Sequence, residues 1–181
     1  MSILFEDRVD SAFIEKAKEV SRSLGISPNW LMAVIELETA GTFSPSITNS
    51  LGYVGLIQFG KQASERIGTT QFELSKMSAV EQLDYVYEYY RIYRSKLKSY
   101  VDLYIATLFP VALGKPNDFV LEAKGLSAEK VAFANPLFDL NKDKRITVGE
   151  IEEKLLRRVP DGYKEELKKK LNSCPRCGHS F

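Results

Sequence analysis

The chain has 181 residues, with 25 basic and 24 acidic side chains and a formal net charge of +1. This length allows one domain with an appendage and enough buried surface for a stable core. The balanced charge argues against nucleic acid as the main partner, because phosphate binding depends on surplus lysine and arginine. No apolar run approaches membrane-spanning length, so we also expect no membrane span.

Residues 10–24 place apolar side chains at helical spacing between charged ones, which predicts an amphipathic first helix ending at Gly25. Ser27 is a typical helix cap, and Pro28 suits the first helical position. Gly41 is a typical stop. The helix between these signals is apolar nearly all round, so we expect it in the centre of the core.

Two carboxylates, Glu36 and Glu38, interrupt this apolar helix. They are two residues apart, about 200° around the axis, and cannot share a face. Glu38 lies on the bulkiest apolar stripe and in the last turn, where burial and the helix dipole both raise a carboxyl pKa. A carboxylic acid that keeps its proton near neutral pH is suited to general acid catalysis. Glu36 ranks second, and either carboxylate can instead reach solvent or satisfy a backbone group.

Glu38-Thr39, a polar loop and the segment GYVGLIQF at residues 52–59 resemble the signature of soluble lytic transglycosylases, glycoside hydrolase family 23, related to goose-type lysozymes. In that family a Glu followed by Ser ends a helix, and a Gly-x-x-Gly-Leu-Met-Gln segment follows at a similar separation. The resemblance covers roughly residues 10–115 and is to the phage-type members. It implies that Glu38 is the catalytic acid/base and that Gln58 contacts substrate.

The resemblance further implies an all-α, lysozyme-like domain that cleaves the β-1,4 bond between MurNAc and GlcNAc in peptidoglycan. We expect no cofactor for catalysis. The first residues, MSILFEDRVD, lack the basic start of a secretion signal, so we expect no signal peptide. The expected location is therefore a phage virion tail, with virion tail proteins as partners, or the host cytoplasm before lysis. The alternative is a non-catalytic virion or cell-wall-binding protein that retains the fold.

A short helix is expected at residues 63–67, and a capping box of Ser78 and Glu81 predicts a long helix to residue 100. That helix holds more tyrosines than a buried stripe needs. Aromatic rings stack on sugar rings, although half-buried core tyrosines explain the pattern equally well. Asp84 faces away from the buried stripe and is a candidate second acid. The candidate substrate-binding residues are Gln58, Tyr53, Gly55, Tyr85, Tyr89 and Tyr104.

Residues 101–113 are expected to form a buried helix that Pro110 kinks or ends. At this point the family usually has an Ala-Tyr-Asn-x-Gly motif, whose tyrosine contacts the catalytic centre. This chain instead reads ATLFP at residues 106–110. Tyr104 and Phe109 are both candidates for the place of that tyrosine, and the sequence does not choose between them.

The segment DLNKDKRITVGE, residues 139–150, spaces oxygen-bearing side chains like an EF-hand calcium loop. Position 6, normally glycine, is Lys144, which must adopt a strained conformation or open the loop. Glu150 also completes a capping box with Thr147, so it has a structural role without a metal. Calcium here would fix the C-terminal subdomain. The candidate ligands are Asp139, Asn141, Asp143, Arg145, Thr147 and Glu150.

Near the C-terminus, Cys174, Cys177 and His179 resemble half of a zinc ribbon. They leave one zinc position to an outside ligand, and the alternative is a flexible tail with free thiols or a disulfide. The expected domains are a lysozyme-like domain at residues 1–133, an EF-hand-like loop and helix at residues 134–160, and a charged helix with the Cys/His tail at residues 161–181.

Overall fold

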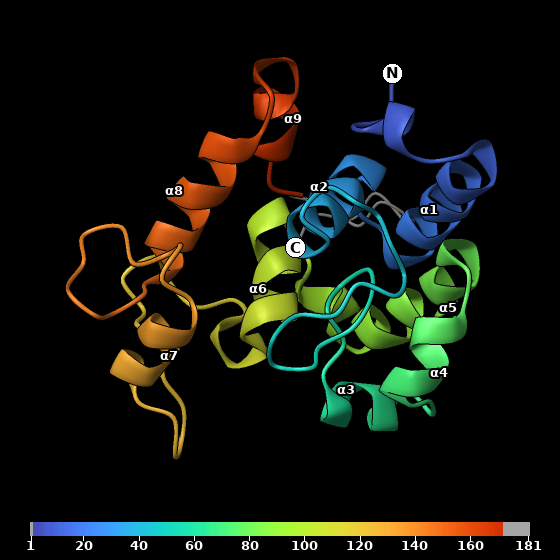
Figure 1. Ribbon diagram of the computed structural model, residues 1–181. Helices are drawn as coiled ribbons and strands as arrows, with labels where there is room; N and C mark the ends of the chain where they lie inside the picture. The colour runs from blue at the N-terminus through green and yellow to red at the C-terminus, as the bar shows by residue number, and fades with distance from the viewer. Residues whose placement is uncertain (1, 172–181) are drawn as a thin grey trace. The chain divides into compact units, whose positions relative to one another are not determined.

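A computed structural model describes residues 2–171 of the chain (Figure 1). This part is mostly helical and contains isolated β-bridges but no strand, which confirms the all-α prediction. It divides into two compact units, residues 2–97 with Leu171 and residues 98–170. The division therefore falls well before residue 133, where we expected the first domain to end. No helix in residues 2–171 is long and apolar enough to cross a membrane.

The first unit is built on helix α1, which packs against both α2 and α5 (Figure 1). Its largest fully buried side chains include Trp30, Leu31 and Ile35 of α2 and Leu83 and Tyr90 of α5. The central position predicted for α2 is therefore confirmed. The elements of this unit are η1 (Glu6–Arg8), α1 (Ser11–Leu24), α2 (Pro28–Glu38), α3 (Lys61–Arg66), α4 (Gln71–Lys76), α5 (Ala79–Tyr90) and η2 (Arg91–Lys96).

Helix α2 begins as its sequence predicts and ends earlier than expected. The Ser27 hydroxyl accepts a hydrogen bond from the Asn29 N–H at 3.2 Å. At the other end Thr39, rather than Gly41, is the cap, and its hydroxyl donates to the Ile35 carbonyl at 2.7 Å. The same hydroxyl accepts from the Phe43 N–H at 3.0 Å. Because the threonine closes the helix and holds the next turn, Glu38 becomes the last helical residue.

Helix α5 opens with the predicted capping box of Ser78 and Glu81. The expected continuous helix to residue 100 is wrong, because the chain tightens into η2 after Tyr90 and a new helix starts after Ser99. The Ser99 hydroxyl accepts from the Asp102 N–H at 3.0 Å, which is an N-cap that the sequence reading missed. A second missed cap, Thr70 with Glu73, opens the unpredicted helix α4.

The second unit packs α6 against α8 around fully buried Leu103, Leu121, Ile146, Ile151 and Leu155. Helix α6 ends directly before the segment that begins with Pro110, as predicted, because proline cannot continue the hydrogen-bond ladder. The elements of this unit are α6 (Tyr100–Leu108), η3 (Pro110–Ala112), α7 (Ala128–Ala134), α8 (Val148–Arg158), η4 (Asp161–Tyr163) and α9 (Lys164–Leu167).

A buried polar side chain, Gln82 of α5, joins three segments of the first unit. Its Oε1 accepts from the Leu56 N–H at 2.6 Å. Its Nε2 donates to the carbonyls of Pro45 and Leu74, at 2.9 Å each. Since the side chain is 0% exposed and all three partners are backbone groups, Gln82 fixes the long loop after α2 against α4 and α5.

We expect Gln82→Leu to lower the free energy of unfolding by about 3 kcal/mol, because the buried Leu56 N–H and the Pro45 carbonyl lose their Gln82 partner and the Leu74 carbonyl keeps only its bond from the Met77 N–H. Gln62→Leu, at an exposed position of α3, is the matched control and should change stability little. Urea denaturation followed by circular dichroism measures both. Equal midpoints for the two variants would contradict the role given to Gln82.

Candidate functional site

The candidate site of the first unit is centred on Glu38, the last residue of α2. The seven residues before Glu36 are buried, whereas Glu38 itself is half-buried. The helix thus leaves the core at this side chain, and the cap at Thr39 fixes its position. The backbone that carries Glu38 is therefore fixed, and part of the residue is exposed.

An aromatic cluster around Tyr89 lies within electrostatic reach of Glu38. The Tyr89 ring meets Phe59 edge-on at 6.1 Å between centroids and Tyr90 edge-on at 5.2 Å. A tilted contact with Tyr93, at 5.9 Å, extends the cluster toward η2. Tyr89 is buried, with 7% of its surface exposed. Through Phe59, the last residue of GYVGLIQF, the cluster joins that segment to α5.

Arg66, the last residue of α3, packs against two rings of this cluster. Its guanidinium lies over the rings of Tyr89 and Tyr93, at 5.0 and 5.7 Å from their centroids. Its Nη1 also donates to the Tyr93 hydroxyl at 3.1 Å. Cation–π contacts and the hydrogen bond together hold the positive charge beside the aromatic rings.

The hydroxyl of Tyr89 stays neutral throughout the physiological pH range. Burial raises its pKa far above the usual value of a tyrosine, and the neighbouring Tyr93 and the negative charge of Glu38 act in the same direction. Arg66 opposes the rise through its charge and its hydrogen bond. The site therefore presents a hydroxyl that keeps its proton close to a carboxyl group.

The remaining candidate tyrosines occupy different surroundings. Tyr53 is 42% exposed, and its ring lies across Gly60, where a Cβ atom would come within 2.6 Å of it. Tyr85 is half-buried on α5. Tyr104 belongs to the second unit, is 3% exposed and packs against the Phe138 ring at 5.4 Å. Among these tyrosines, Tyr89 is influenced by the charge of Glu38.

Gln58 and Gly55, the other two residues of GYVGLIQF expected to touch substrate besides Tyr53, have structural contacts. The Gln58 Nε2 donates to the carbonyls of Gly55 and Ile47, at 3.0 and 3.4 Å. Gly55 is buried with a φ of 81°, and a Cβ atom there would lie 2.2 Å from the Gln82 Oε1. The close approach that glycine permits at this position is therefore to the Gln82 side chain of α5.

The two carboxylates considered as a second acid or base are in ion pairs. Glu36 meets Arg8 at 3.6 Å, with 17% of its side chain exposed. Asp84, which is exposed, meets Lys16 of α1 at 2.7 Å and raises the lysine pKa. Both side chains thus have structural partners, and Glu38 lies on a different face of α2 from Glu36.

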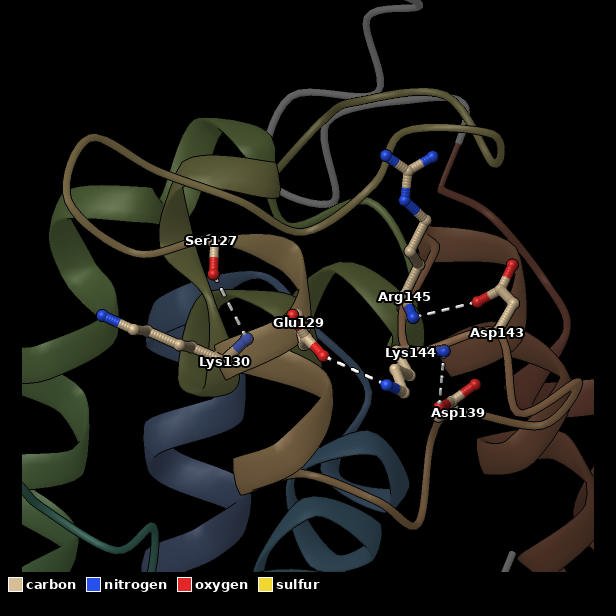
Figure 2. A network of polar contacts seen from close by, with 7 residues as sticks. All are labelled: Ser127, Glu129, Lys130, Asp139, Asp143, Lys144 and Arg145. Atoms are coloured by element: carbon tan, nitrogen blue, oxygen red, sulfur yellow. Dashed lines mark hydrogen bonds and ion pairs between the residues drawn. The ribbon is translucent and has the colours of Figure 1, made fainter.

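The candidate metal ligands are distributed between the second unit and the chain end. Residues 139–150 lie between α7 and α8 and include the first turn of α8. Four of them, Asp139, Asp143, Lys144 and Arg145, are drawn in the polar network of Figure 2. Within residues 2–171, no three His, Cys, Asp or Glu side chains converge closely enough to hold a metal ion. The candidate zinc ligands Cys174, Cys177 and His179 lie outside the described residues.

Sequence reasoning missed two residues of the site and its support, Arg66 and Gln82. Arg66 sits at the end of a short helix with no motif around it, and nothing in the sequence places it over two tyrosines far along the chain. Gln82 follows a recognisable capping box, but a glutamine on a predicted helix is usually exposed. Only the packing of α5 against the loop shows that it is buried.

The protein was compared with models of known families, with curated proteins and with solved structures. None of the three comparisons found a match.

The raised pKa of Tyr89 predicts a pH dependence of stability. The unfolded chain releases this proton near pH 10, whereas the folded protein retains it, so stability is complete below pH 10 and falls above it. The expected loss from this group is up to about 1.4 kcal/mol per pH unit. Urea denaturation between pH 9 and 11 should show a weaker decline in Tyr89→Phe than in wild type.

The control for this measurement is Tyr53→Phe, which removes the hydroxyl of an exposed tyrosine from the same unit. We expect Tyr53→Phe to follow the wild-type decline. Parallel curves for wild type and Tyr89→Phe would show that burial of Tyr89 does not retain the proton.

Proposed function

We propose that this protein is a peptidoglycan-cleaving glycosidase that acts on the β-1,4 bond between MurNAc and GlcNAc, with Glu38 as its general acid and base. The observation that carries the proposal is the placement of Glu38, half-buried at the end of a buried helix and electrostatically coupled to Tyr89. The resemblance of Glu38-Thr39 and GYVGLIQF to soluble lytic transglycosylases supports the same assignment.

In the proposed reaction, Glu38 gives its proton to the glycosidic oxygen as the bond from the MurNAc C1 to that oxygen breaks. The resulting carboxylate then takes a proton from the nucleophile that attacks C1. When the nucleophile is the C6 hydroxyl of the same sugar, the product is an anhydro sugar and one carboxylate serves both steps. When it is water, the product is a reducing end, as in a lysozyme.

The ion pairs of the other carboxylates favour the anhydro product. Glu36 is held by Arg8 and Asp84 by Lys16, so neither is poised as a separate base for water. A mechanism in which Glu38 acts as acid and then as base needs no second carboxylate. We therefore propose lytic transglycosylase activity ahead of hydrolysis.

Tyr89 and Arg66 are proposed to support Glu38 as positioning residues. The Tyr89 hydroxyl keeps its proton and is suited to donate a hydrogen bond to a carboxylate or a sugar oxygen. Arg66 holds the Tyr89 and Tyr93 rings in place through cation–π contacts. In this proposal Tyr89 takes the part of the tyrosine whose Ala-Tyr-Asn motif the chain lacks.

The proposed partners are the glycan strands of peptidoglycan, together with virion tail proteins if the protein is part of a phage particle. The phage-type resemblance supports a location in the virion tail, or in the host cytoplasm before lysis. The second candidate function is a non-catalytic virion or cell-wall-binding protein with the same fold. The observation that favours it is ATLFP at residues 106–110, in place of the Ala-Tyr-Asn motif.

The decisive variant is Glu38→Gln, which keeps the size of the side chain and removes its acid. We expect loss of peptidoglycan cleavage by about 100- to 10,000-fold, because general acid catalysis contributes that much. Dye release from labelled peptidoglycan measures the rate, and mass analysis of the fragments for anhydro ends identifies the nucleophile.

Glu36→Gln is the matched control, since it makes the same change two residues earlier on another face of α2. It should retain cleavage. Equal rates for wild type and Glu38→Gln would remove Glu38 from its assigned role. Binding of peptidoglycan without cleavage by any variant would favour the non-catalytic function.

Tyr89→Phe should lower turnover about 10- to 100-fold, because the reaction loses a neutral hydrogen-bond donor beside the general acid. It should also shift the limb of the pH–rate profile that reports Glu38, which a general loss of stability does not do. Tyr87→Phe, on the same helix, is the control and should keep both the rate and the profile. An unchanged pH–rate profile in Tyr89→Phe would contradict its positioning role.

A further inference from the structure

The loop Asp139–Glu150 joins α7 to α8 within the second unit and carries the oxygen spacing of a calcium-binding loop. Its ends are held close to each other by the Glu150 carboxylate. Oε1 accepts from the Leu140 N–H at 3.1 Å, and Oε2 accepts from the Thr147 N–H at 2.9 Å. Glu150, at position 12, is thus hydrogen-bonded to the backbone of Leu140, at position 2.

The backbone bends at the position where calcium loops normally have glycine. Lys144, at position 6, has a φ of 65°, a left-handed conformation that non-glycine residues rarely adopt. The Lys144 N–H donates to the Asp139 Oδ2 at 3.1 Å, which draws position 6 onto position 1 (Figure 2). Of the two outcomes expected for lysine here, the chain takes the strained conformation and keeps the loop closed.

The middle of the loop is anchored to the unit's core. Ile146, at position 8, is 0% exposed, and its carbonyl accepts from the Leu121 N–H at 2.8 Å. The buried Ile146 side chain fixes the loop to the core, whereas residues 141–145 before it are exposed. The loop is therefore held at position 8 as well as at its two ends.

The basic side chains of the loop do not occupy its interior. The Lys144 ammonium pairs with Glu129 of α7 at 3.2 Å, and Figure 2 shows the Arg145 guanidinium directed away from Asp139. Lys142 is exposed. The interior is left to oxygen atoms, among them the Asp143 Oδ1, which accepts from the Arg145 N–H at 2.9 Å.

The decisive atom is the Asp139 Oδ1. It is buried from solvent and has no hydrogen-bond partner, although Oδ2 of the same carboxylate accepts from the Lys144 N–H. Buried carboxylate oxygens are nearly always satisfied by a donor, a water molecule or a cation. An unsatisfied oxygen at position 1 of a twelve-residue loop, where such loops place their first metal ligand, points to a cation.

We propose that this loop binds a calcium ion. The ligands are the side chains of Asp139, Asn141, Asp143 and Thr147, the carbonyl of Arg145, and Glu150 after it exchanges its backbone hydrogen bonds for the metal. Three of these six donors are Asp or Glu carboxylates, and Glu150 becomes the third of them at the ion only after that exchange. Calcium accepts six to eight oxygens at flexible geometry, whereas magnesium demands a stricter octahedron.

Bound calcium would fix α7 against α8 and so stabilise the second unit. Three basic side chains in the loop, Lys142, Lys144 and Arg145, offset its three carboxylates. We therefore expect an affinity in the weaker part of the known range, with a dissociation constant of about 10⁻⁵ to 10⁻³ M.

The test is thermal unfolding of the full chain after chelation, followed by titration with calcium chloride or magnesium chloride. Calcium at a few times the dissociation constant or more should raise Tm by about 5 °C, and magnesium should raise it less. Terbium luminescence, excited through the protein's aromatic residues, measures occupancy directly and does not depend on a stability change.

Asp139→Asn and Glu150→Gln should abolish the calcium-dependent rise in Tm and the terbium signal. Asp118→Asn removes one exposed carboxylate of the same unit outside the loop and should keep both. If Asp139→Asn fails to fold, Asp143→Asn gives the same comparison at the exposed position 5. No calcium effect in wild type, or an equal effect in wild type and Asp139→Asn, would overturn the proposal. Neither result bears on peptidoglycan cleavage.

Discussion

The burial of helix α2 is the constraint on which the candidate site depends. A helix that is apolar nearly all round is stable in water only when other elements cover it, and here α1 packs against it. The seven buried residues from Asn29 to Ile35 fix its axis, and with it the backbone that carries Glu36 and Glu38. Glu38 is thus positioned by hydrophobic packing that lies before it in the chain.

The polar support of the site is concentrated in two side chains. Gln82 satisfies three buried backbone groups and so fixes the loop that contains GYVGLIQF. Arg66 lies over two tyrosines and places positive charge beside their rings. Gln82 thus holds the loop in place, and Arg66 holds the tyrosine rings. The hydrogen bonds of Gln82 replace those that water would otherwise make to the same backbone groups.

The two units carry different candidate sites. The first holds a general acid candidate with a neutral hydroxyl nearby, which is suited to glycosidic bond cleavage. The second holds a closed loop with an unsatisfied buried carboxylate oxygen, which is suited to a hard cation. Because the two sites lie in separate compact units, each proposal stands on its own contacts and is tested by its own measurements.

The sequence by itself determined the helical class, the start of α2 at Ser27, the capping box at Ser78 and the end of α6 before Pro110, because these depend on local hydrogen bonding and fixed backbone angles. It also singled out Glu38, from apolar periodicity. Tertiary structure alone decided that Gln82 is buried and that Arg66 covers Tyr89, since both contacts join segments far apart in the chain. The break after Tyr90 likewise depends on a competing cap that periodicity does not reveal.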